Sequence, residues 1–290
     1  MFEQFMKKGV CFVLAALMLV LFGGQVSKVG ASDIALAVIG PHEYALPVNY
    51  ESFNVFVQYA FWNDNSEGDG VVADSDSDTF VGLTKYVRFF TLDALPNIGL
   101  AYEVIQPAVH VVNNDTNDSV TGLGDTITGP AAWFKPSENS TVGLQSFLQV
   151  PIGDDELSNH AWRTLTSLFF DWQIGKLNLD GNAGLIASTD SRYNGVKKEI
   201  GTIYHANLRV GYRVSNMFEP FVAWDWNTSD SGKNKTTGET IASFDETALG
   251  AGLMVHFSPN ISMTARYTKA VDARNVTETD GVYFKFAYVW

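Results

Sequence analysis

The last ten residues, Gly281-Val282-Tyr283-Phe284-Lys285-Phe286-Ala287-Tyr288-Val289-Trp290, alternate between two kinds of side chain. Every second residue from Val282 to Trp290 is large and apolar or aromatic, whereas the other face carries Gly281, Tyr283, Lys285, Ala287 and Val289. Successive side chains of a β-strand point to opposite faces of the sheet. The segment therefore predicts a strand with one face towards lipid and the other towards the lumen of a membrane barrel.

The same alternation recurs in the segments that precede this one. Between the apolar residues of 261–268 stand Ser262, Thr264, Arg266 and Thr268, and between those of 202–213 stand His205, Asn207, Arg209 and Gly211. A face this rich in glycine, histidine and arginine would be a poor core for a soluble sheet. It suits the polar lumen of a barrel.

Twelve segments of this kind can be counted, which predicts an all-β fold, a transmembrane antiparallel barrel of about 12 strands. Their expected spans are 52–62, 78–92, 97–109, 121–134, 141–151, 162–174, 177–188, 200–213, 218–228, 245–257, 261–270 and 281–290. Short connections alternate with longer, more acidic ones, as periplasmic turns alternate with external loops in such barrels. A soluble β-sandwich would also alternate, but it would not need aromatic residues at its strand ends.

The N-terminus has the composition of a secretory leader. Lys7 and Lys8 precede the apolar run from Val10 to Phe22, which is too short to span a bilayer as a helix, and small residues follow up to Ala31. We therefore expect a cleaved signal peptide at 1–31 and a barrel at 52–290. The segment 32–51 between them is either a plug inside the lumen or a disordered periplasmic tail.

Charge and cysteine content exclude several classes of function. The chain has 19 Lys and Arg against 32 Asp and Glu, and the expected leader holds three of the former and one of the latter, so the remainder carries a net charge of −15. A nucleic-acid partner is not expected of such an acidic protein, because phosphate binding needs cations. The single cysteine, Cys11, lies in the expected leader, which leaves no thiol for catalysis or disulfides.

No constellation of residues indicates an enzyme, a cofactor or a metal site. The sequence has no G-x-S-x-G nucleophile motif, and His205 and His256 fall on the expected inner face, where lipid chemistry does not take place. The acidic run from Asp74 to Asp78 lacks the glycine and glutamate that a calcium loop requires. We expect no enzyme activity, no cofactor and no metal.

Alternation also predicts which charged side chains face the lumen, because a cation turned to mid-bilayer lipid costs about 2–4 kcal/mol. The expected inner residues are Arg88, Glu103, Gln145, Gln149, Arg163, Asp180, His205, Arg209, Asp225, His256, Arg266 and Lys285. Arg209, Arg266 and His256 are expected to line the pathway. Lys85 is the contrary case, because it shares parity with Leu83, Val87 and Phe89, and its strand is expected to have either a shifted parity or a bulge.

Two features resemble known families. The C-terminal strand, with Phe286, Tyr288 and Trp290, resembles the assembly signal that barrel-insertion machinery reads in bacterial outer-membrane proteins. The stretch Gly122-Leu123-Gly124-Asp125, followed by Gly129-Pro130 and Trp133-Phe134, resembles the outer-membrane family labelled for the meta-pathway of phenol degradation. That family is similar in style to the fatty-acid-transporter type of channel for hydrophobic compounds.

The second resemblance implies passive transport of small, aromatic or hydrophobic solutes across the bacterial outer membrane. Outer-membrane lipid and lipopolysaccharide, the insertion machinery and the solute are then the expected partners. Asp125 is expected either to accept hydrogen bonds at the base of a loop or to take part in gating by pairing with an inner arginine. The alternative function is a non-transporting surface barrel, used for adhesion or envelope structure.

Overall fold

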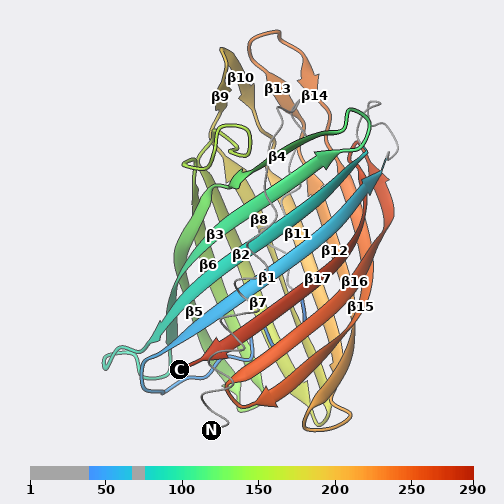
Figure 1. The fold of residues 1–290 in the computed structure, drawn as a ribbon. Coiled ribbons are helices and arrows are strands. Elements are labelled where there is room, and N and C mark those ends of the chain that lie inside the picture. Colours follow the sequence, from blue (N-terminus) through green and yellow to red (C-terminus); the bar gives the residue numbers. More distant parts are fainter. Residues whose placement is uncertain (1–38, 67–75) are drawn as a thin grey trace, which may run out of the picture.

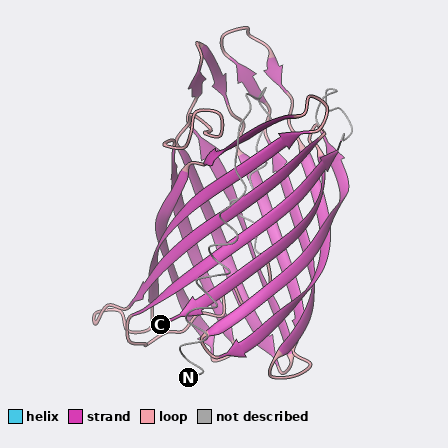
Figure 2. Ribbon diagram, viewed as in Figure 1, coloured by secondary structure: helices cyan, strands magenta, loops and turns pink. Residues whose placement is uncertain are grey.

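The structure, a computed structural model, describes residues 39–66 and 76–290, and its long strands form one antiparallel barrel (Figures 1 and 2). In the described part twelve strands build the wall: β1 (Phe53–Ser66), β2 (Ser77–Phe90), β3 (Gly99–Asn113), β5 (Thr126–Ser137), β6 (Ser140–Val150), β7 (Arg163–Ile174), β8 (Leu177–Ser188), β11 (Ile203–Tyr212), β12 (Phe218–Ser229), β15 (Asp245–Ser258), β16 (Ile261–Arg274) and β17 (Glu278–Val289). A short strand, β4 (Asp118–Leu123), precedes β5 and pairs with the outer part of β3. The predicted fold class is confirmed.

The barrel closes between its first and last strands. β1 pairs with β17 from Val55 opposite Val289 to Ser66 opposite Glu278, and its other edge pairs with β2. Each wall strand of the described part therefore has a hydrogen-bonded neighbour on both sides. A bilayer demands this closure, because its core has no water to satisfy a free strand edge.

The two faces of the wall differ as the sequence predicts. Large side chains at alternate positions point outwards and stay exposed, among them Trp172, Tyr212, Trp224, Phe257, Tyr267, Tyr288 and Trp290. All of these except Trp224 and Tyr267 lie near strand ends, where aromatic side chains suit the interface between lipid and water. No helix in the described ranges is long and apolar enough to cross a membrane.

The C-terminus and the short turns lie at one end of the barrel, and the longer connections lie at the other (Figure 1). At that second end stands a small sheet that the sequence did not predict, which we call the crown sheet. It consists of β9 (Ser191–Tyr193), β10 (Val196–Glu199), β13 (Gly232–Asn234) and β14 (Thr240–Ile241). Lys197 and Lys235 donate hydrogen bonds to Asp190 beside it and hold the pKa of that carboxyl at about 2.

The expected leader, 1–31, lies outside the described residues, and so does the first part of the segment 32–51. The remainder of that segment, residues 39–51, is described. We call residues 39–51 the N-terminal plug, because their side chains contact the inner wall, as the next section shows.

Candidate functional site in the lumen

The inner wall has an apolar half and a polar half. On β1 to β7 it is lined mainly by aliphatic and aromatic side chains, including Val57, Leu83, Ile105, Phe147 and Phe169, all buried. On β8 to β17 it carries buried polar and charged groups, including Asp180, His205, Arg209, Glu219, Thr264 and Arg266. A solute in the lumen therefore contacts apolar side chains on one side and side chains that can form hydrogen bonds on the other.

The structure places most of the predicted inner residues on the lumen side. Buried there are Glu103, Gln145, Gln149, Arg163, Asp180, His205, Arg209, Arg266 and Lys285. Asp225 and His256 also face inwards and are half-buried. These positions come from nine different strands, and strand parity alone brings them to one surface.

The prediction for β2 is wrong at Arg88. Arg88 is exposed on the outer face and donates a hydrogen bond to Asn54 Oδ1 at 3.0 Å. Lys85 instead points into the lumen, where its Nζ lies 2.6 Å from Glu103 Oε2. β2 runs without a bulge, because its register with β1 is continuous. The inner face of this strand is apolar, so its hydrophobic side chains do not mark the lipid side.

Arg209 and Arg266 belong to a buried ion-pair cluster with Asp225. Arg209 Nη2 lies 2.7 Å from Asp225 Oδ1, and Arg266 Nη2 lies 2.8 Å from Asp225 Oδ2. Arg209 also donates to the carbonyls of Leu208 and Trp224, at 2.8 and 3.1 Å. Both guanidinium groups are thus engaged in bracing β11, β12 and β16, and are not held open towards a passing solute.

The N-terminal plug lies against the polar wall through charged and amide groups. Glu43 Oε1 accepts from Lys285 Nζ at 2.6 Å, and the backbone N–H of Glu43 donates to Asp180 Oδ2 at 2.9 Å. Trp133 Nε1 donates to the carbonyl of Pro47 at 2.7 Å from the opposite side. The chain is thereby held across the lumen near the end of the barrel that carries the short turns and the C-terminus (Figure 1).

Aromatic contacts hold the same segment against the apolar wall. The ring of Tyr44 stacks on Phe169 with a centroid separation of 4.5 Å, and Asn182 Nδ2 donates to its hydroxyl at 2.7 Å. Farther along, Tyr50 stacks parallel to Trp133 at 6.3 Å and donates to the carbonyls of Phe90 and Leu100. These contacts place aromatic rings of the plug in the space that a solute would have to cross.

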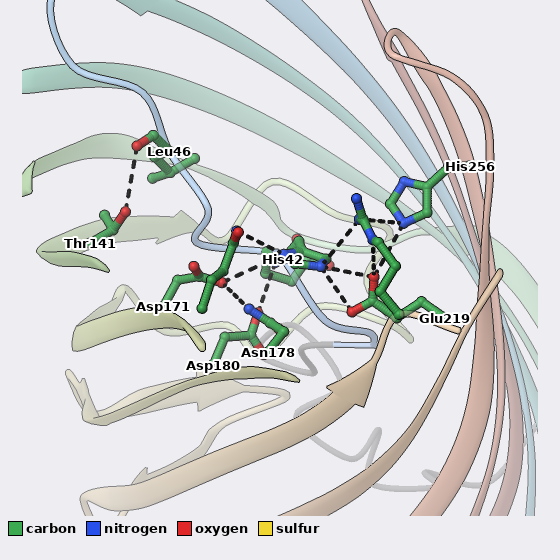
Figure 3. A network of polar contacts seen from close by, with 11 residues as sticks. His42, Leu46, Thr141, Asp171, Asn178, Asp180, Glu219 and His256 are labelled. Atoms are coloured by element: carbon green, nitrogen blue, oxygen red, sulfur yellow. Dashed lines mark hydrogen bonds and ion pairs between the residues drawn. The ribbon is translucent and has the colours of Figure 1, made fainter. Parts of the chain in front are cut away.

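His42 is the centre of a polar network that spans the lumen (Figure 3). Its Nε2 lies 2.9 Å from Glu219 Oε1 of β12, and its Nδ1 lies 3.8 Å from Asp171 Oδ2 of β7. Glu219 is fully buried, and its Oε2 also accepts from Arg213 Nε at 3.0 Å and lies 3.4 Å from His256 Nε2. Histidine held between two carboxylates ties the plug to two separate parts of the wall.

Sequence reasoning missed this network almost completely. His42, Asp171, Arg213 and Glu219 were not among the candidates, and only His256 was. One local sign exists in the structure, since His42 has a left-handed backbone with φ of 61°. Such a conformation is uncommon for a residue other than glycine and needs support from its surroundings.

A cavity of about 380 Å³ lies between the plug and the apolar half of the wall. Its aromatic and aliphatic lining includes Tyr44, Phe89, Trp133, Phe147 and Phe169. Its charged lining comprises two carboxylates and two ammonium groups in two ion pairs, Glu43 with Lys285 and Glu103 with Lys85. An apolar cavity of roughly 150 Å³ can bind benzene, so this one has room for a solute of one or two rings.

The Gly-x-Gly-Asp stretch organises the loop that follows β6. Buried Asp125 accepts from the backbone N–H of Gly153 at 3.0 Å and of Asn159 at 2.9 Å. A Cβ on Gly153 would lie 2.7 Å from the carbonyl carbon of Gly124 and 2.8 Å from the backbone N of Asp125, so the loop approaches this stretch too closely for a larger residue at position 153. The structure places Asp125 at the base of this loop, in hydrogen bonds to backbone amides.

This arrangement predicts that the hydrogen bonds of Asp125 keep the loop of residues 151–161 in a fixed conformation. Asp125→Ala removes the acceptor of two buried N–H groups, each of which costs about 1–3 kcal/mol when left unpaired. We expect limited proteolysis of folded barrel to cut within 151–161 several times faster than in the unmodified protein. Asp118→Ala, at the start of β4, is the control, and equal cutting rates in D125A and D118A would contradict the assignment.

In the described part of the chain, no group of three His, Cys, Asp or Glu side chains is placed to hold a metal ion. Many polar groups of the lumen are instead engaged with each other or with the plug. The arrangement can hold a small amphipathic molecule by packing and hydrogen bonds.

Comparison with known proteins gives consistent results. A family model described as "Putative MetA-pathway of phenol degradation" matches residues 63–286. The crystal structure of an outer membrane channel from Pseudomonas putida F1 matches with a TM-score of 0.73 and 16% identity, over 87% of this chain and 100% of that one. The β domain of the Bordetella autotransporter BrkA matches with a TM-score of 0.52 and 12% identity, over 82% and 99% of the two chains. No match was found among curated proteins.

Proposed function

Because the chain belongs to the family described as "Putative MetA-pathway of phenol degradation" and folds as an outer-membrane barrel, we propose that it is a non-enzymatic channel for small, uncharged aromatic or hydrophobic solutes. Passage is passive. The observation that carries this proposal is the 380 Å³ cavity, with aromatic side chains on one side and paired charges on the other.

The charges of the lumen support an uncharged solute. The cations Lys85, Lys285, Arg209 and Arg266 each lie within 2.8 Å of a carboxylate oxygen. Because each of these cations lies beside a carboxylate, with Arg209 and Arg266 sharing that of Asp225, the field that could attract ions is weakened. A solute that carries a full charge would also lose its hydration against the apolar half of the wall, which is costly without a partner.

The apolar half of the wall supports a hydrophobic solute. Buried Phe61, Val81, Leu83, Val109 and their neighbours continue the apolar surface beyond the cavity, along β1 to β3. Burial of apolar area is favourable at about 25 cal/mol per Å², so this surface gives such a solute a path of similar affinity through the barrel. Hydrogen-bonding groups, among them Gln145 and Asn182, would orient a hydroxyl or carbonyl.

Uptake by cells tests the proposal. Phenol and benzoate have one ring each, but at neutral pH only the carboxylate is charged. In a porin-deficient Gram-negative host we expect the protein to raise the uptake of labelled phenol several-fold over the empty host and to leave benzoate uptake unchanged. Equal stimulation of both solutes would contradict selection for neutral molecules.

The second candidate function is the non-transporting surface barrel. Its support is the plug itself, since Tyr44 and His42 are fixed to the wall across the lumen. If the host with the protein takes up neither phenol nor benzoate faster than the empty host, this alternative stands.

A further inference from the structure

An exposed cation lies on the outer face of the barrel, close to the end that carries the short turns and the C-terminus. Arg88 stands two residues before the end of β2. It points away from the lumen, on the face that meets lipid. At this height, near the strand end, the surrounding medium is the headgroup region of the periplasmic leaflet rather than the hydrocarbon core.

Aromatic side chains surround Arg88 on the neighbouring strands. Tyr102 lies directly opposite it on β3 and is exposed, and Asn54 lies opposite it on β1. The backbone N–H and C=O of Asn54 bond to Trp290, which therefore continues the same row. Tyr86 lies on the same outer face, two residues before Arg88 on β2. Its ring lies 6.3 Å from that of Trp290, and its hydroxyl donates to Asn54 Oδ1 at 2.8 Å.

The charge of Arg88 is held by a neutral partner. Its Nη1 donates to Asn54 Oδ1 at 3.0 Å, and within the described residues no ion pair joins it to a carboxylate. Two other outward-facing cations are paired: Lys269 with Asp280 and Arg274 with Asp245. The guanidinium of Arg88 thus has N–H groups turned to the membrane interface without an anion in the protein.

We propose that Arg88, framed by Tyr86, Tyr102 and Trp290, binds the phosphate of a phospholipid in the periplasmic leaflet. The planar guanidinium can donate two parallel hydrogen bonds to phosphate oxygens, and Asn54 fixes its orientation by holding one arm. The flanking rings suit the boundary between headgroup and acyl chain, where tyrosine and tryptophan are enriched. This inference rests on the outer face alone and does not depend on transport through the lumen.

Native mass spectrometry of the purified full-length barrel tests the site, with dioleoyl phosphatidylglycerol added in increasing amounts. One arginine or lysine near an anionic membrane surface raises the affinity for that surface about fivefold. We expect Arg88→Gln to weaken lipid binding by that factor. Arg88→Lys is expected to give an intermediate loss, because an ammonium cannot form the two parallel bonds. The control Lys176→Gln, which removes an exposed cation from the turn between β7 and β8, is expected to bind like the unmodified barrel.

Unchanged binding by R88Q would overturn the proposal, as would an equal loss in K176Q, which would indicate attraction to charge in general. The first outcome would point to the C-terminal carboxylate of Trp290 as the partner of Arg88. Heat-modifiability on gels shows whether each variant is folded. If R88Q does not assemble, R88K decides, and binding by R88K at the level of the unmodified barrel would overturn the two-bond site.

Discussion

Deleting residues 39–50 is expected to raise the single-channel conductance of the protein in planar bilayers several-fold. The deleted segment carries His42, Glu43 and Tyr44, which fix the chain across the lumen. The barrel should still form, because each wall strand in the described part is paired on both sides without help from the plug. Ion current is the appropriate readout, since the open lumen would hold water even if the natural solute is apolar.

Two further variants give this deletion its controls. Lys235→Ala changes only the crown sheet and should leave the conductance unchanged. The triple variant His42→Ala, Glu43→Ala and Tyr44→Ala keeps the segment but removes its main side-chain contacts, and we expect a conductance between the two extremes. A deletion variant that assembles and conducts no better than the full chain would show that other residues close the pore.

Asp225→Asn is expected to lower the free energy of unfolding by about 3–5 kcal/mol, the range for loss of one partner from a buried ion pair. The substitution keeps the shape of the side chain but leaves Arg209 and Arg266 next to each other without their shared carboxylate. Both guanidinium groups are buried, so water cannot replace the lost charge. Reversible urea unfolding of the barrel from lipid vesicles measures the change.

Asp93→Asn provides the comparison, because Asp93 is exposed in the turn between β2 and β3. Surface substitutions of this kind usually change stability by less than about 0.5 kcal/mol. A D225N barrel that unfolds at the same urea concentration as D93N would mean that the Arg–Asp–Arg cluster adds no stability. The arginines would then be free to serve the pathway, as the sequence analysis predicted for them.

Strand parity was the part of the structure that the sequence predicted best. The expected segment at 177–188 coincides with β8, and most of the others differ from the wall strands by a few residues. The alternation of side chains predicts the strands because a barrel wall separates lipid from the lumen. Successive residues of each strand therefore face different surroundings. The crown sheet was missed because its strands are only two to four residues long, too short to show a period.

The assumption that the lumen is polar throughout caused the error at Arg88. On β2 the inner face carries Leu83, Val87 and Phe89, which pack in the lumen, while the outer face carries Tyr86 and Arg88 near the membrane interface. Polarity alone cannot assign the faces of such a strand. The register of β2 with β1 and β3 decides which of its side chains face the lumen and which face lipid.

The plug could not be predicted, because its contacts join residues far apart in the chain. His42 and Glu219 are separated by 177 positions, and Glu43 and Lys285 by 242. No local pattern links such pairs, so the sequence left residues 32–51 open between a plug and a tail. The structure places residues 39–51 in the lumen, and the movement of these residues becomes the central question for transport.

A reversible disulfide between the plug and the wall tests that question most directly. A Cβ at Gly40 would lie 3.5 Å from the Cβ of Thr264 on β16, within the separation of about 3.5–4.5 Å that disulfides span. The only native cysteine, Cys11, lies in the expected leader, so Gly40→Cys with Thr264→Cys should form a single cross-link. If solutes pass where the plug now lies, phenol uptake should fall to the level of the empty host when the pair is oxidised and recover on reduction, with each single variant unaffected. Uptake that is the same in the oxidised and reduced states would contradict a pathway gated by the N-terminal plug.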